Sequence, residues 1–325
     1  MKKIIIALFF IYSKTAIVFA QFAPQAGFAG TTAIHADSAV IINWANNCTL
    51  KLGYQNIADT ALGLVSVGSK ENAIGKADGR IVSLGDGGEA ILHFDNLIVN
   101  GPGPDFVVFE NGFSFDDSLY FLELAFVEVS SNGRDFVRFE PTSLTNTNLQ
   151  IGAFEGLDAK KINNLAGKYI APYGTPFDLD ELKNNPLIDV NHIKFIKIID
   201  VVGSIDETFG SKDKNNNLIN DPWPTPFPSG GFDLDAVGVI HQKYSTSIKK
   251  SYLKTINLYP NPVKASSSIT ITEIDMIDEF VLLNQFGELA SYATNFDIIA
   301  PEKPGVYFYK IRHKDKESTG KLIVY

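Results

Sequence analysis

Short apolar runs separated by turn-forming residues dominate the chain between residues 21 and 242. Apolar and polar positions alternate within many of these runs, which is typical of strands, and Gly, Pro and Asn cluster between them. Helical periodicity is weak, and short helices are predicted only over 157–165 and 178–182. The pattern therefore predicts an all-β fold, a jelly-roll-like β-sandwich. The expected strands are 39–44, 90–94, 106–109, 121–129, 136–139, 193–202 and 232–240.

One β-hairpin is predicted in particular detail. Apolar positions alternate on either side of Asn132-Gly133 within 127–136. Asn-Gly readily supplies the two positive φ values that a two-residue hairpin turn requires. A tight hairpin is therefore expected at this point.

The two ends of the chain follow different patterns. Lys2 and Lys3 precede the apolar stretch 4–12, and Ala20 offers a small residue for cleavage, which predicts a signal peptide. The apolar stretch is too short to span a bilayer. After the polar, basic segment that begins at 243, the sequence pattern changes to one typical of a compact second unit. The expected organisation is a signal peptide, a large domain, a linker and a C-terminal domain over 1–20, 21–242, 243–254 and 255–325.

The C-terminal domain carries an ordered series of motifs. Leu-Tyr-Pro-Asn-Pro occupies 258–262, Gln-Phe-Gly-Glu-Leu occupies 285–289, and Pro-Gly-Val-Tyr-Phe-Tyr-Lys-Ile occupies 304–311, before a last apolar strand. This order resembles the type A C-terminal sorting domain of the Bacteroidetes type IX secretion system. One departure is the end of the chain, Val324-Tyr325, where the family often has lysines. The residues that carry the resemblance are Tyr259, Pro260, Asn261, Pro262, Gly287, Gly305 and Tyr307.

The residues of this domain also predict a fold without the resemblance. The two prolines stiffen its entry, and alternating apolar positions fit a small Ig-like sandwich of seven strands. The resemblance adds a route: the signal peptide leads to the periplasm, and the sorting domain then leads through the type IX machinery. The mature protein is thereby expected to be secreted or attached to the outer-membrane surface. Its own function is expected within 21–242.

Composition excludes several classes of protein. Lys and Arg number 28 against 37 Asp and Glu, a net charge of −9, which argues against a nucleic-acid partner. A single cysteine, Cys48, excludes an intramolecular disulfide framework and a multi-cysteine metal site. No segment after the signal peptide is long and apolar enough to predict a transmembrane helix. The sequence lacks the zinc-protease, serine-hydrolase, P-loop and dinucleotide-binding motifs, so an enzyme is not expected.

An Asp/Asn-rich loop is the candidate metal site. Its oxygen-bearing side chains occupy positions 1, 3, 5 and 9 of a run that begins at Asp213, a spacing that suits Ca²⁺. Leu218 replaces the glycine of an EF-hand loop, so this is a different kind of loop. The alternative is a solvated turn, which Asp and Asn also favour. The expected ligands are Asp213, Asn215, Asn217 and Asp221, with the carbonyl group of Ile219.

Further acids and aromatic residues form a candidate ligand-binding set. Asp233 and Asp235 are expected on one face of a strand, and Asp105 and Glu110 bracket another. The Pro-rich loop 221–228 presents aromatic rings that could stack on a sugar. The alternatives are acids on edge strands and rings packed beneath the loop. The set is Trp223, Phe227, Asp233, Asp235, Asp105 and Glu110.

Four blocks of the large domain, 83–95, 101–113, 123–136 and 229–240, are similar to uncharacterised secreted bacterial surface proteins. They resemble more loosely the jelly-roll carbohydrate-binding and discoidin-like modules. This resemblance implies a non-enzymatic binding protein for a glycan, a surface receptor or another extracellular ligand. A hydrolase with paired carboxylates and an adhesin or structural surface component are the alternatives.

Overall fold

The computed structural model describes residues 22–115, 119–243, 257–271, 277–313 and 316–325. The predicted signal peptide and nearly all of the predicted linker lie outside the described residues. The chain divides into two compact units, Met1–Ser245 and Thr246–Tyr325, each described below by itself. In the described part of the chain, no helix has the length and apolar character needed to cross a membrane.

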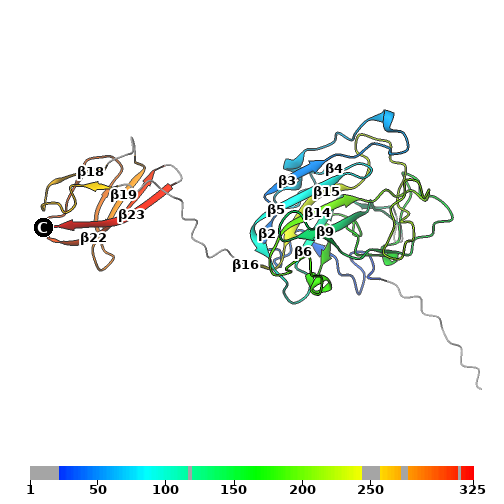
Figure 1. Ribbon diagram of the computed structural model, residues 1–325, viewed down its shortest axis with the longest axis horizontal. Helices are drawn as coiled ribbons and strands as arrows, with labels where there is room; N and C mark the ends of the chain where they lie inside the picture. The colour runs from blue at the N-terminus through cyan, green and yellow to red at the C-terminus, as the bar shows by residue number, and fades with distance from the viewer. Residues whose placement is uncertain (1–21, 116–118, 244–256, 272–276, 314–315) are drawn as a thin grey trace, which may run out of the picture. The chain divides into compact units, whose positions relative to one another are not determined.

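The large domain contains two six-stranded antiparallel sheets (Figure 1). The first sheet has the order β1 (Ile34–His35), β13 (Tyr173–Phe177), β6 (Phe106–Glu110), β15 (Asp233–Val239) and β2 (Asn43–Trp44), and β4 (Val82–Ser83) also pairs with β15. The second has the order β10 (Val137–Arg138), β9 (Ala125–Ser130), β14 (Ile193–Asp200), β5 (Glu89–Ile98) and β16 (Gln242–Lys243), and β3 (Asn47–Lys51) also pairs with β5.

The main core lies between these two sheets. Phe106 and Leu234 from the first sheet and Leu92 and Ile196 from the second belong to one buried cluster. Strand β5 shows the underlying pattern, because its first six residues alternate between half-buried and buried positions. The prediction of an all-β sandwich is confirmed.

The central strands β6 and β15 are buried along their whole lengths. One face of β6 contributes to the main core, and the other places Val107 and Phe109 in a separate cluster against Ile34, Ile41 and Trp44. Burial on both faces explains why 106–109 is an unbroken apolar run in the sequence.

Several predicted elements differ in detail. The run 121–129 splits into β8 (Tyr120–Phe121) and β9, and 39–44 contributes only β2. The two expected helices are the short 3₁₀ turns η3 (Ala159–Lys161) and η4 (Leu179–Leu182). The hairpin joins β9 to β10, but its loop is longer than predicted. The Asn132 side chain accepts the N–H groups of Arg134 and Asp135, and only Gly133 of the Asn-Gly pair has a positive φ.

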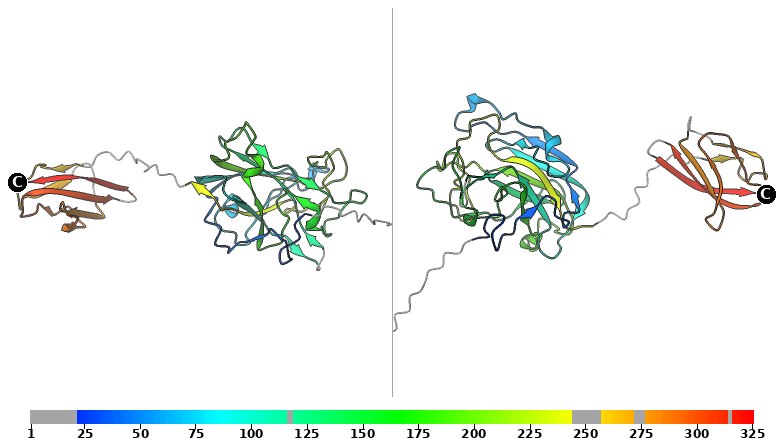
Figure 2. Two further views of the ribbon diagram at one scale, coloured as in Figure 1. Left: turned by 90° about the horizontal axis from the view of Figure 1, so that it is seen from below. Right: turned by 180° about the vertical axis from the view of Figure 1, so that it is seen from behind.

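The C-terminal domain is a second, smaller sandwich around its own apolar cluster (Figure 2). A three-stranded sheet has the order β17 (Leu258–Tyr259), β18 (Ser268–Ile271) and β21 (Ile298–Ile299). A four-stranded sheet has the order β20 (Leu289–Ala293), β19 (Glu279–Leu283), β22 (Gly305–His313) and β23 (Lys316–Val324). The described residues thus contain the two small sheets of the predicted sandwich.

Several motif residues of this domain form hydrogen bonds that hold its turns and strands in place. The Asn261 side chain donates to the Lys321 carbonyl at 2.6 Å and accepts from the Ile323 N–H at 3.0 Å, so Asn261 fixes the entry segment to β23. Gly287 N–H closes a turn on Asn284, and the Tyr307 hydroxyl donates to Lys303. Pro260 and Pro262 follow cis peptide bonds, Tyr259 is exposed, and Gly305 begins β22.

Candidate functional site

One pocket of the large domain combines aromatic walls with buried acids. Its volume is about 210 Å³. The pocket is formed by the segment after β6, by the strand pair β7 (Phe113–Ser114) and β8, by two loops and by the first residue of β15. We call it the aromatic pocket, and it is lined by Asn111, Phe113, Phe121, Glu123, Ala153, Phe154, Thr225, Phe227, Ser229 and Asp233.

The aromatic rings form two groups. Phe113 and Phe121 face each other across β7 and β8 and stack with centroids 5.0 Å apart, and the Phe115 ring lies edge-on to both. Phe154 and Phe227 form the second group, with centroids 6.0 Å apart. Phe154 is 77% exposed although it is a large apolar side chain. Solvent-facing rings grouped around a pocket are typical of a binding site.

Glu123 lines this pocket from the segment between β8 and β9. Its neighbours Leu122 and Leu124 are buried in an apolar cluster, so alternation turns the Glu123 side chain to the other side. Gly167 packs tightly on the Glu123 backbone, because a Cβ atom there would lie 1.9 Å from the Glu123 carbonyl oxygen. The Glu123 side chain is buried, and burial raises its pKa well above the ordinary value, with further contributions from Asp233 and Glu110.

Asp233 is the second acid of the pocket. Its carboxylate accepts hydrogen bonds from the Ser83 hydroxyl and from the Asn111 side-chain amide, the latter at 2.8 Å. Burial raises the pKa of Asp233 to about 6 despite these two donors. Glu110 does not line the pocket, but burial and the charge of Asp233 raise its pKa as well. One Glu110 carboxylate oxygen accepts from the Gly112 N–H, and the other has no hydrogen-bond partner among the described residues.

Three more buried acids surround this group. Asp200 accepts the N–H groups of Gly87 and Phe232. Asp221 accepts the N–H of Leu124, and Asp86 accepts from the Ile57 N–H and the Trp223 indole. Burial raises the pKa of each of these acids. The hydrogen bonds of these three acids join loops at one end of the sandwich, so we assign the acids to holding these loops together.

The structure brings together only part of the ligand-binding set predicted from sequence. Phe227 and Asp233 line the aromatic pocket, whereas the Trp223 indole donates to Asp86 at 3.0 Å and does not line it. Asp235 accepts the N–H groups of Asp78 and Gly79, and has no hydrogen-bond partner in common with Asp233. The pairing of β15 with β6 shifts register between Leu234 and Ala236, which breaks the simple alternation assumed for these two acids.

Asp105 also lies outside the aromatic pocket. It is fully buried and accepts hydrogen bonds from the N–H groups of Gly101 and Leu179. Its Oδ1 atom lies 2.8 Å from Nδ1 of His241. Asp105 therefore ties three loop segments together.

The predicted calcium loop forms a small hairpin. Asp213 Oδ1 accepts the N–H groups of Asn215 and Asn217, and Oδ2 accepts the Ser143 N–H. Asp221 lies beyond the base of the hairpin and belongs to the buried acids, while the Ile219 N–H bonds to Ser211. Within the described residues, no group of three His, Cys, Asp or Glu is placed to hold a metal ion. The hydrogen bonds to Asp213 account for the turn, and calcium at this loop stays a prediction.

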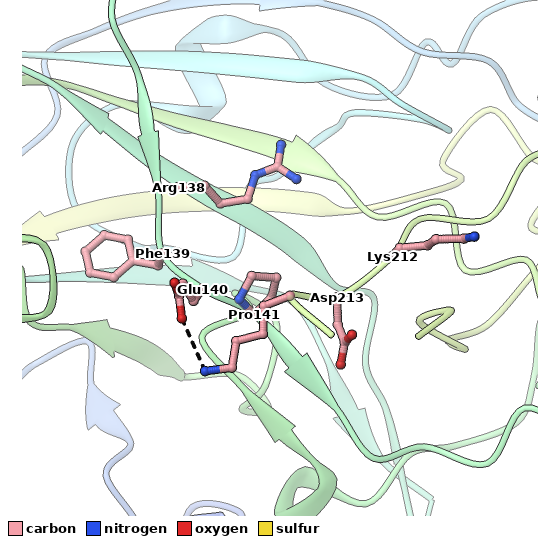
Figure 3. Close-up of a pocket in the computed structure, with 7 residues that line it drawn as sticks. Arg138, Phe139, Glu140, Pro141, Lys212 and Asp213 are labelled. Carbon is pink, nitrogen blue, oxygen red and sulfur yellow. Dashed lines mark hydrogen bonds and ion pairs between the residues drawn. The ribbon is translucent and has the colours of Figure 1, made fainter. Parts of the chain in front are cut away.

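A second pocket, of about 250 Å³, lies beside Asp213 (Figure 3). Figure 3 shows the Asp213 carboxylate pointing away from Arg138. The cations here already have partners: Arg138 pairs with Glu128 at 2.8 Å, Lys214 with Glu140 at 3.2 Å and Lys212 with Glu207 at 3.7 Å. The pocket is lined by Arg138, Phe139, Glu140, Pro141, Lys212, Asp213 and Lys214.

Sequence reasoning missed Glu123 and most of the aromatic residues of the pocket. A signal for Glu123 was present, because this acid interrupts the apolar run 120–127. A charged residue within a buried strand requires a partner or a function. The aromatic residues carried no such signal, because they come from separate loops that only the fold brings together.

Comparisons with known proteins add little. Neither a protein-family model nor a curated protein matches the chain. A structure of PorZ, described as an essential bacterial surface component of the type-IX secretion system of Porphyromonas gingivalis, shares 16% identity and a TM-score of 0.20. The match covers 28% of this chain and 14% of that protein, so this chain spans only a small part of its length. A likeness at this TM-score does not establish a shared fold.

Proposed function

We propose that the protein is an extracellular binding protein whose large domain holds a glycan unit in the aromatic pocket. The observation that carries the proposal is the combination, in one pocket, of exposed phenylalanine rings with buried acids and an amide. Aromatic rings provide flat apolar contact surfaces, and the Glu123, Asp233 and Asn111 side chains provide hydrogen-bonding groups beside them. Sugars need both, because they have apolar faces and hydroxyl-bearing edges.

The proposed location rests on the sequence. The apolar segment at the N-terminus and the ordered motifs of the C-terminal domain support export through the type IX secretion machinery, with release or attachment at the outer-membrane surface. The separate cores of the two domains support this division of labour, because each unit has its own apolar cluster. In this proposal the C-terminal domain serves export and the large domain binds.

A glycan panel tests the binding proposal. The purified protein is expected to bind at least one class of extracellular glycan, and Phe227→Ala is expected to lower the affinity by about 1–3 kcal/mol through lost apolar contact. Phe154→Ala is expected to act in the same direction. Phe286→Ala, an exposed phenylalanine of the C-terminal domain, is the matched control and is expected to change nothing. Binding that is unaffected by both pocket substitutions would place the ligand elsewhere.

A second candidate function is glycoside hydrolysis, and one observation favours it. Two carboxyl groups, Glu123 and Asp233, line the same pocket, and burial raises the pKa of Glu123 well above its ordinary value, as in the general acid of a glycosidase. Turnover of a bound glycan by the wild type, lost in Glu123→Gln with an unchanged melting curve, would establish the hydrolase. Stable binding without product is the result that the binding proposal expects.

A further inference from the structure

No cation among the described residues pairs with the acids of the aromatic pocket. Neither Glu123 nor Asp233 forms an ion pair with any residue in the described part of the chain. The buried Lys168 does not serve this purpose, because its Nζ atom donates to the Ile162 carbonyl and its charged neighbour is Asp158. A buried negative charge without a counter-ion is costly.

Glu123 differs from the other buried acids in its hydrogen bonding. Asp86, Asp200 and Asp221 each accept at least one backbone N–H group, so the fold itself accounts for them. The Glu123 carboxyl has no hydrogen bond to any described residue, although only 5% of the residue is exposed and it lines the pocket. Buried polar side chains are nearly always hydrogen-bonded. Unlike the unpartnered oxygen of Glu110, the Glu123 carboxyl is not among the fully buried atoms without a partner, so a donor that enters the pocket can reach it.

We infer that the glycan unit bound in the aromatic pocket carries a free, protonated amine, which pairs with Glu123 and Asp233. This inference rests on the proposed glycan-binding function and specifies its ligand as an amino sugar. An ammonium group has three hydrogen-bond donors and one positive charge. It can therefore donate a hydrogen bond to the Glu123 carboxyl and at the same time provide a counter-charge for Asp233.

The aromatic rings suit the same ligand. Cations are attracted to the faces of aromatic rings, and four phenylalanines line the same pocket as the acids. A neutral hydroxyl group can donate to Glu123, but it brings no charge to offset Asp233 and Glu110. The amine therefore fits the whole group of acids better than a hydroxyl group does.

Three trisaccharides with the same β-1,4-linked glucose backbone test the inference. They are the glucosamine trimer, its fully N-acetylated counterpart and cellotriose, and their affinities for the full chain are measured by calorimetry. The glucosamine trimer is expected to bind about tenfold more tightly than the other two, a difference of about 1.4 kcal/mol, because its ammonium group forms a charge-assisted hydrogen bond. Glu123→Gln is expected to remove this preference, and Asp233→Asn to reduce it.

Two controls make the result specific. Phe227→Ala is expected to weaken binding of the three trimers by similar factors. Asp95→Asn changes an exposed acid on β5 and is expected to leave the preference for the glucosamine trimer intact.

Equal binding of the three trimers, or preference for a neutral one, would overturn the inference of an amine while the glycan proposal stands. Binding of other glycans but of none of these trimers would also overturn it. Failure to bind any glycan would contradict the proposed function itself.

Discussion

At the scale of single residues, burial of acids without cations determines how the large domain responds to pH. The folded state holds a proton on Asp233 more tightly than the unfolded chain does, because burial raises its pKa from 3.8 to about 6. The corresponding stabilisation is complete below the unfolded pKa and is lost as the pH rises through the folded pKa. The raised pKa values of Glu123 and Glu110 act in the same direction.

The free energy of unfolding is therefore expected to fall between about pH 4 and pH 7, and Asp233 is expected to contribute about 3 kcal/mol to the fall. Asp233→Asn should remove that contribution. Urea unfolding at a series of pH values measures it, with Asp95→Asn as the exposed control. A pH slope that Asp233→Asn leaves unchanged would show that Asp233 has an ordinary pKa.

At the scale of elements, the hydrophobic pattern predicted the strand interiors well and their ends poorly. Strands β5, β6, β14 and β15 follow directly from apolar runs. Strand β13 was not predicted; it contains Pro176, a residue unusual inside a sheet, yet it pairs with β6. The register shift in β15 was invisible in the sequence, because a bulge depends on the partner strand.

The candidate site was predicted only in part for a related reason. Asp233 stood out as one of two acids expected on one face of a strand, and Phe227 as an aromatic residue of the Pro-rich loop 221–228. Trp223 stood out for the same reason, but its indole found a buried partner in Asp86. Glu123 interrupts an apolar run, but its lack of hydrogen-bond donors is a property of the packed structure and could not be predicted from the sequence. Local sequence therefore located two of the residues that line the aromatic pocket and missed Glu123.

Calcium binding by the hairpin around Asp213 remains a testable prediction at this scale. Calcium is expected to raise the melting temperature, since a ligand at a hundredfold excess over Kd adds about 2.7 kcal/mol to stability. Asp213→Ala should abolish the response. A melting temperature indifferent to millimolar calcium and to chelator would leave the hydrogen bonds to Asp213 as the full account of this turn.

At the scale of the whole molecule, two sandwiches with separate cores predict separable functions. Deletion of 255–325 removes the C-terminal cluster and none of the main core of the large domain. The shortened protein is expected to fold with an unchanged melting temperature of the large domain and to accumulate in the periplasm. Cell fractionation and immunoblotting measure this distribution. Normal amounts of the shortened protein at the surface or in the medium would contradict the sorting role.

The central claim is that the aromatic pocket, rather than the charged pocket beside Asp213, holds the ligand. The most direct test is a heteronuclear NMR titration of residues 21–242 with the glycan selected from the panel. The account predicts that the largest shift changes occur at Asn111, Glu123, Thr225, Ser229 and Asp233. Changes concentrated instead at Arg138, Glu140, Lys212 and Lys214 would contradict it.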